Sequence, residues 1–98
     1  MTDITGDIAF IADQATPDDI LDFGFIWTTW LAGDTILTSS WTLPAGLSEA
    51  QADEQTTTVT TVWIDFSAAE QGVQYQVTNV ITTAGGRSKE LSFFVPVV

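Results

Sequence analysis

The chain has 98 residues, enough for one small domain, and its 13 acidic and two basic residues give a formal net charge of -11. It has no cysteine and no histidine, which excludes disulfides, thiolate nucleophiles, imidazole bases, the common zinc sites and the serine triad. The negative charge argues against nucleic acid and membrane partners, because phosphate backbones and anionic lipids are bound through clustered Lys and Arg.

Apolar and aromatic residues are abundant for so small a domain. Hydrophobic residues make up 45% of the chain, which includes four Trp, six Phe and one Tyr. The chain should therefore fold, although a domain of this size has difficulty hiding all of its aromatic surface. We interpret the surplus as the mark of an assembly subunit present in multiple copies, whose neighbours cover what one copy leaves exposed.

Targeting signals are not expected. No stretch approaches 18 apolar residues, and the start at Met1 lacks the basic segment of a secretion signal. We expect a protein that is made and kept in the cytoplasm, or that leaves the cell by lysis.

The first 17 residues are expected to form an N-terminal arm or a peripheral strand, with a single sandwich domain at residues 18–98. Pro17 disfavours a helix at the preceding residue, which sets the boundary. Because the arm carries Ile8, Phe10 and Ile11, we expect it to dock on its own domain or on a neighbour, and we predict these three side chains as contact residues.

Residues 20–26 alternate in the manner of a strand, with Leu21, Phe23 and Phe25 on one side. Residues 27–31 place Trp27, Trp30 and Leu31 on one helical face, so a single helical turn is expected to bury both indoles. Gly33 and Asp34 then predict a turn.

Residues 35–43 are predicted to form a strand with one inner face, made of Leu37, Ser39, Trp41 and Leu43. Residues 44–46 end this strand, because proline has no backbone N–H to donate to a neighbouring strand. Residues 47–55 are polar and acidic, and we interpret them as a connection with a helical turn at residues 48–52.

The second half of the chain predicts three strands. Residues 56–66, 73–82 and 88–97 alternate, and their inner residues are Val62, Ile64, Phe66, Val73, Tyr75, Val77, Asn79, Ile81, Leu91, Phe93 and Val95. Residues 84–87 supply a hairpin turn with two glycines. Tyr75 invites comparison with the tyrosine corner of Greek-key sandwiches. Five or six short strands and 16 threonines predict an all-β, two-sheet sandwich.

Carboxylates are the only catalytic candidates that the composition leaves. Asp18, Asp19 and Asp22 cluster before the first strand of the sandwich, while Asp34 and Asp65 lie at turns. General acid and base catalysis needs two carboxyl groups held across a cleft, and we favour solvated acids at strand ends instead. We predict no catalytic, cofactor-binding or metal-binding residues and no enzyme activity. A calcium ion bound between strand loops stays open as an alternative.

Both basic residues, Arg87 and Lys89, fall in one predicted turn. On so acidic a chain they form the sole positive spot, which suits contact with an acidic patch on an adjacent subunit. The alternative is that they keep an exposed hairpin tip soluble and protect a sheet edge.

Two aromatic residues break the alternation of their strands. Trp63 and Phe94 should lie on the face opposite the core, together with Val80, and we predict that these three residues contribute to subunit contacts. The four Trp residues also allow a sugar-stacking platform, but core packing is the better explanation of Trp27, Trp30 and Trp41, which recur in phase with other apolar residues.

Several segments resemble small immunoglobulin-like virion proteins of tailed bacteriophages. In the first half of the match they are residues 23–31 (FGFIWTTWL), 33–36 (GDTI), 40–43 (SWTL) and 46–47 (GL). In the second half they are residues 61–64 (TVWI), 72–83 (GVQYQVTNVITT) and 86–87 (GR). The resemblance covers roughly residues 21–97, and it implies a small immunoglobulin-like β-sandwich with an N-terminal extension.

The resemblance implies a non-enzymatic structural protein of the virion, related to fiber-tail adaptors, that joins the tail or neck to fibers. Its expected partners are other virion proteins of the tail, neck, fiber or capsid. A capsid decoration or cement protein on the head exterior is the alternative within this class. A carbohydrate-binding sandwich is the alternative of another class, and it predicts a row of exposed aromatic side chains.

Overall fold

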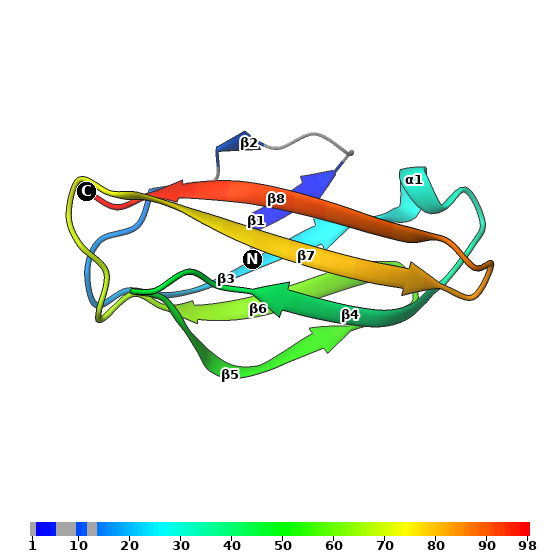
Figure 1. Ribbon diagram of the computed structural model, residues 1–98, viewed down its shortest axis with the longest axis horizontal. Helices are drawn as coiled ribbons and strands as arrows, with labels where there is room; N and C mark the ends of the chain where they lie inside the picture. Colours follow the sequence, from blue (N-terminus) through cyan, green and yellow to red (C-terminus); the bar gives the residue numbers. More distant parts are fainter. Residues whose placement is uncertain (1, 6–9, 12–13) are drawn as a thin grey trace.

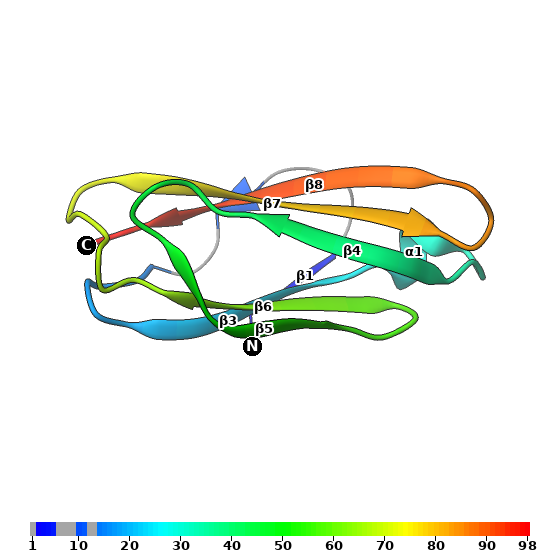
Figure 2. The same ribbon diagram turned by 60° about the horizontal axis from the view of Figure 1, so that its bottom comes forward.

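Two four-stranded sheets face each other in the computed structural model, which describes residues 2–5, 10–11 and 14–98 (Figures 1 and 2). Sheet A has the order β1-β3-β6-β5 and consists of β1 (Thr2–Thr5), β3 (Ile20–Ile26), β6 (Val59–Asp65) and β5 (Ser48–Gln55). Sheet B has the order β2-β8-β7-β4 and consists of β2 (Phe10–Ile11), β8 (Ser88–Pro96), β7 (Gln74–Thr83) and β4 (Ile36–Thr42). One short helix, α1 (Thr28–Leu31), joins β3 to β4.

The central strands pair antiparallel, whereas the two short N-terminal strands pair parallel at the sheet edges. In sheet A, β6 lies between β3 and β5, and in sheet B, β7 lies between β8 and β4. This order gives two largely antiparallel sheets packed face to face, which is the architecture of a β-sandwich. The expected small β-sandwich is thus confirmed.

The described parts of the first 17 residues pair with the sandwich itself. β1 extends sheet A beside β3, and β2 extends sheet B beside β8. Ala15 continues along the last strand, because its N–H donates to the carbonyl of Pro96 (3.0 Å) and its own carbonyl accepts from Val98 (2.9 Å). Ile8 lies outside the described residues. The division at residue 17 stays a prediction.

β3 and α1 form as the sequence predicts. Phe23 and Phe25 are buried, and Leu21 packs against the core from the strand's start. Trp27 is also buried and meets the ring of the partly buried Trp30 edge to face, with 5.7 Å between ring centres. The helical turn therefore brings the two indoles together.

The inner face predicted for residues 35–43 is wrong at one position. The register of β4 against β7 shifts between Ile36 and Thr38, so Leu37 turns outward and is 63% exposed, while Ile36 is buried. A bulge inserts one residue and reverses the alternation on one side of it. Beyond the bulge, Trp41 and Leu43 pack against the core as expected.

The connection and helical turn predicted for residues 47–55 are also wrong, because Ser48–Gln55 is the edge strand β5. All of its residues are exposed, and its pairing with β6 contains two register shifts. An edge strand needs only backbone pairing on one side, so it can form without the apolar alternation that a sequence pattern detects.

The strands of the second half carry the core as predicted. The predicted inner residues of these strands that are buried are Val62, Ile64, Phe66, Tyr75, Val77, Asn79, Ile81, Leu91, Phe93 and Val95. The predicted hairpin joins β7 to β8, and its turn is closed by a hydrogen bond from the N–H of Thr83 to the carbonyl of Arg87 (2.8 Å).

Aromatic rings fill the centre of the sandwich and come from both sheets. Phe23 of β3 meets Phe93 of β8 with 5.1 Å between ring centres. Phe25 stacks on Trp41, with 5.7 Å between centres and 13° between planes. Much of the aromatic surface that the composition suggested would need neighbours is therefore buried within one copy.

Hydrogen bonds between buried side chains cross the core and join both sheets. Nε1 of Trp27 donates to Oγ1 of Thr60 (3.0 Å), which in turn donates to Oδ1 of Asn79 (2.7 Å). Nδ2 of Asn79 donates to Oγ of Ser39 (3.0 Å) and to the carbonyl of Ser40 (2.9 Å). Because Thr60 is on β6 and Asn79 on β7, these bonds fix how the sheets lie on one another.

Candidate interaction surfaces

The contact residues predicted on β6, β7 and β8 point away from the core, but they lie on opposite faces of the sandwich. Trp63 alternates with the buried residues of β6 and belongs to the outer face of sheet A. Val80 and Phe94 do the same on β7 and β8 and belong to the outer face of sheet B. All three side chains are half-buried. A single partner surface therefore cannot cover Trp63 together with the other two.

On sheet B, Val80 and Phe94 belong to the same outer face but are not register partners. Val80 is opposite Glu90, while Phe94 is opposite Gln76. On its other side Phe94 is the register partner of Ile11 in β2, so the structure brings these two predicted contact residues to the same sheet edge.

On sheet A, Trp63 stands in a row across three strands. Its register partners are Asp22 on β3 and Gln51 on β5. Ile20, two positions before Asp22, is 60% exposed on the same face. The outer face of sheet A thus combines exposed apolar area with carboxylates.

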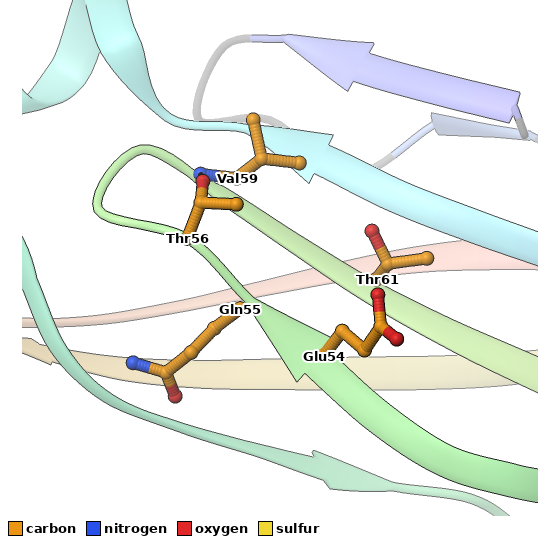
Figure 3. Close-up of a pocket in the computed structure, with 5 residues that line it drawn as sticks. All are labelled: Glu54, Gln55, Thr56, Val59 and Thr61. Atoms are coloured by element: carbon orange, nitrogen blue, oxygen red, sulfur yellow. The ribbon is translucent and has the colours of Figure 1, made fainter.

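A shallow, open hollow of about 310 Å³ lies at the β5–β6 turn, lined by Glu54, Gln55, Thr56, Val59 and Thr61. Figure 3 shows that the Gln55 side chain points away from Glu54 and Thr61, and its Nε2 donates to the carbonyl of Leu37 on β4 (3.2 Å). Glu54 is the one ionisable residue of the lining. The hollow therefore lacks the pair of poised groups that acid and base catalysis needs.

Arg87 is held by its own chain at the end of the sandwich. Its Nη2 donates to the carbonyl of Leu31 (2.7 Å), its Nη1 to that of Trp30 (3.3 Å), and its Nε to Oδ2 of Asp34 (3.2 Å). The side chain of Arg87 is 41% exposed, and it is an ion-pair partner of Asp34. Contact of Arg87 with an adjacent subunit stays a prediction, as does the alternative that it keeps an exposed hairpin tip soluble and protects a sheet edge.

The surroundings of Lys89 differ from those of Arg87. It is opposite Ile81 in the β7–β8 register and is half-buried. Contact of Arg87 and Lys89 with an acidic patch on an adjacent subunit stays a prediction.

The aspartates at turns accept hydrogen bonds from nearby backbone N–H groups. Hydrogen bonds from the Thr83 side chain and the Thr35 backbone lower the pKa of Asp34 to about 2. Hydrogen bonds from the backbone and side chain of Ser67 lower the pKa of Asp65. Both shifts favour the charged form, which is opposite to the shift of a general acid.

Glu49 on β5 differs, because slight desolvation and the nearby charge of Asp53 raise its pKa. Both residues lie on the exposed edge strand and not in a cleft. Over residues 2–5, 10–11 and 14–98, no group of three or more acidic side chains is arranged to hold a metal ion.

Sequence reasoning missed the partners of Arg87 and Asp34, and it missed the hydrogen bonds of Asn79. Arg87 binds carbonyls more than 50 positions earlier in the chain, so no local pattern indicates them. Asn79 did carry a signal, because it is an amide at an inner position of an otherwise apolar alternation. Such a residue needs buried partners.

The family model of podophage GP4 fiber-tail adaptor protein gp77 matches residues 16–96. The chain belongs to this family. The match spans β3 to β8 and confirms the expected relation to phage fiber-tail adaptors. Membership in a phage tail adaptor family implies a virion component with a structural role.

No curated protein matches the sequence. Among solved structures, a similar one is the 2,6-sialyltransferase of Photobacterium sp. JT-ISH-224, in a ternary complex with CMP and lactose. It is 11% identical to this chain with a TM-score of 0.56, and the match covers 97% of this chain but 18% of the sialyltransferase. This likeness concerns the fold alone. No helix in the described part of the chain is long and apolar enough to cross a membrane.

Proposed function

We propose that this protein is a non-enzymatic adaptor of a tailed phage particle, which joins the tail or neck to fibers through protein–protein contacts. The observation that carries the proposal is the fiber-tail adaptor family match over residues 16–96. The carboxylates of the turns support it as well, since Asp34 and Asp65 are engaged with the backbone. Other virion proteins are then its partners, and the assembled particle is its location.

The predicted contact residues give this adaptor two separate surfaces. Trp63 supplies an aromatic anchor on sheet A, and Phe94 with Val80 supplies a second apolar site on sheet B. An adaptor has to bind at least two neighbours, and opposite faces allow both to bind at once. Ile8, Phe10 and Ile11 remain proposed contacts of the N-terminal arm.

The position and copy number of the protein test the adaptor role. Quantitative mass spectrometry of purified particles, with gold-labelled antibody in electron microscopy, should give few copies and label the tail or neck. Copies in proportion to the major shell protein, with label over the head, would instead establish the capsid decoration role.

Substitution of the sheet A anchor tests its contact with a virion partner. Trp63→Gln should weaken incorporation into particles roughly thirtyfold, since loss of an aromatic anchor costs about 2 kcal/mol. Val98→Gln is the control, because Val98 is an exposed apolar residue outside the predicted contact set. Equal incorporation of the two variants, both folded by urea unfolding, would remove Trp63 from the interface.

The carbohydrate-binding alternative has weaker support. Trp27 is 1% exposed, and Trp30 and Trp41 pack against the core. A stacking platform for sugars needs exposed aromatic faces in a row, and Trp63 alone does not make one. No binding on a glycan array is the expected result.

A further inference from the structure

The two sheets differ sharply in charge. Strands β3, β5 and β6 carry five acidic residues and no basic residue: Asp22, Glu49, Asp53, Glu54 and Asp65. Strands β4, β7 and β8 carry only Glu90 and Lys89, which cancel. The net charge of -11 is therefore distributed unevenly, and it largely spares sheet B.

The outward-facing residues of β4, β7 and β8 form what we call the neutral face. Apart from Glu90 they are threonines, serines, glutamines, Leu37, Val80, Phe94 and Pro96. Depletion of charged residues is one mark of the centre of an interface, and Phe94 is an aromatic side chain of the kind enriched there. The rest of the chain is acidic, so solubility alone does not explain why this face has so few charged residues.

Hydroxyl groups on the neutral face already bind one another. Oγ1 of Thr38 on β4 and Oγ1 of Thr82 on β7 are 2.5 Å apart, and Oγ1 of Thr78 and Oγ of Ser92 on β8 are 2.8 Å apart. Removing water from a hydroxyl costs less free energy when the hydroxyl keeps a hydrogen bond within its own chain. The face can therefore be covered at a lower desolvation cost than its polarity suggests.

We infer that the neutral face binds the same face of a second copy of this chain, in a twofold symmetric dimer. Two copies with a charge of -11 each repel, and packing through sheet A brings its carboxylates together. The neutral face is the surface through which copies approach with little added repulsion. A twofold interface pairs a surface with itself, so a face whose one charged side chain is Glu90 meets its own copy with little repulsion.

The dimensions of the molecule suit this dimer. The longest strand of the neutral face, β7, has 10 residues, so three strands give a face of roughly 33 × 14 Å, about half of the 800 Å² per partner that a standard interface buries and the size of a weak, reversible interface. Packed sheets lie about 10 Å apart, a gap that Val80 and Phe94 can fill from both copies. The inference goes beyond the adaptor role, and the outer face of sheet A stays available to other virion proteins.

Sedimentation equilibrium of the purified full-length protein tests the inference. The wild-type protein should form a reversible dimer as its concentration rises to about 1 mM. Val80→Asp places two like charges across the twofold axis and should weaken the dimer by at least roughly tenfold. Val59→Asp is the matched control, because Val59 is a half-buried valine on the outer face of the other sheet, and it should leave the dimer unchanged.

Salt and a second variant keep the test independent of any one substitution. Raising NaCl from about 0.02 to about 0.3 M should strengthen the wild-type dimer, because the remaining repulsion between acidic copies is screened. Phe94→Ser should weaken the dimer if Val80→Asp fails to fold, which urea unfolding detects.

A wild-type protein that stays monomeric over this range overturns the inference without touching the adaptor role, which depends on location in the particle. A dimer that Val59→Asp dissociates and Val80→Asp does not also overturns it. If the wild-type protein is monomeric and Val80→Asp loses incorporation into particles, the neutral face binds a different virion protein.

Discussion

The guanidinium carbon of Arg87 lies 4.2 Å from the centre of the Trp30 ring, and Nη1 of Arg87 donates to the carbonyl of the same residue. Arg87 comes from the β7–β8 hairpin of sheet B, and Trp30 from the helix that leaves sheet A. One side chain therefore ties the hairpin to α1 by a cation–π contact and by hydrogen bonds to the last carbonyls of the helix. This end of the sandwich is fixed by residues far apart in the sequence.

Replacement of Arg87 by lysine should lower the free energy of unfolding by about 1 kcal/mol, because an ammonium group cannot reach two carbonyls and Asp34 from one position. The loss should shrink at high salt, since Arg87 is substantially exposed. Urea unfolding measures it. Lys89→Gln is the control and should have little effect, and equal losses in the two variants would contradict a special role for Arg87.

Asp34 makes stability depend on pH in a defined window. Its pKa falls from the ordinary value of 3.8 to about 2 on folding, so its contribution is present above pH 3.8 and is lost as the pH falls through about 2. The wild-type protein should be more stable than Asp34→Asn near neutral pH, and the difference should vanish near pH 2. Urea midpoints measured from pH 7 to pH 2 give this difference, and a difference that is independent of pH would contradict the assignment.

The strands of the second half were predictable because each satisfies a local pattern. Tyr75, Val77 and Ile81 alternate with polar residues, and glycines mark the turns on both sides. The same alternation placed Trp63 and Phe94 away from the core. That they face opposite directions depends on which strands pair, which the alternation does not encode.

Two elements escaped prediction for different physical reasons. β5 is held by backbone bonds to β6 and has no buried side chain, so its sequence carries no alternation. Leu37 is displaced by a bulge, and a bulge leaves the apolar pattern intact while it reverses the facing of the residues. The contacts of Asp34 with Gly85 are equally hidden, because they join positions 51 residues apart.

Tyr75 performs the corner role expected of it, and its hydroxyl can be removed selectively. Its oxygen accepts a hydrogen bond from the N–H of Glu70 (2.9 Å), and its ring packs so closely on Gly46 that a Cβ there would lie 3.1 Å from it. Tyr75→Phe should lower the free energy of unfolding by about 1 kcal/mol, the usual net value of one hydrogen bond. Thermal and urea unfolding measure it, and an unchanged midpoint would show that the link before β7 needs no such anchor.

Two tryptophans in the same ring cluster should respond differently to loss of the indole N–H. Nε1 of Trp27 donates to Thr60, whereas Nε1 of Trp41 is buried and has no hydrogen-bond partner among the described residues. Trp41→Phe removes a donor whose burial is unfavourable, which offsets the packing it loses, and it should cost no more than about 1 kcal/mol. Trp27→Phe loses a hydrogen bond as well as packing, and it should cost about 1–2 kcal/mol more than Trp41→Phe. Each ring centre lies 5.7 Å from that of Phe25, so the pair is matched in its aromatic surroundings. Equal losses in urea unfolding, or a larger loss for Trp41→Phe, would mean that ring packing and not the indole donor decides the stability of this core.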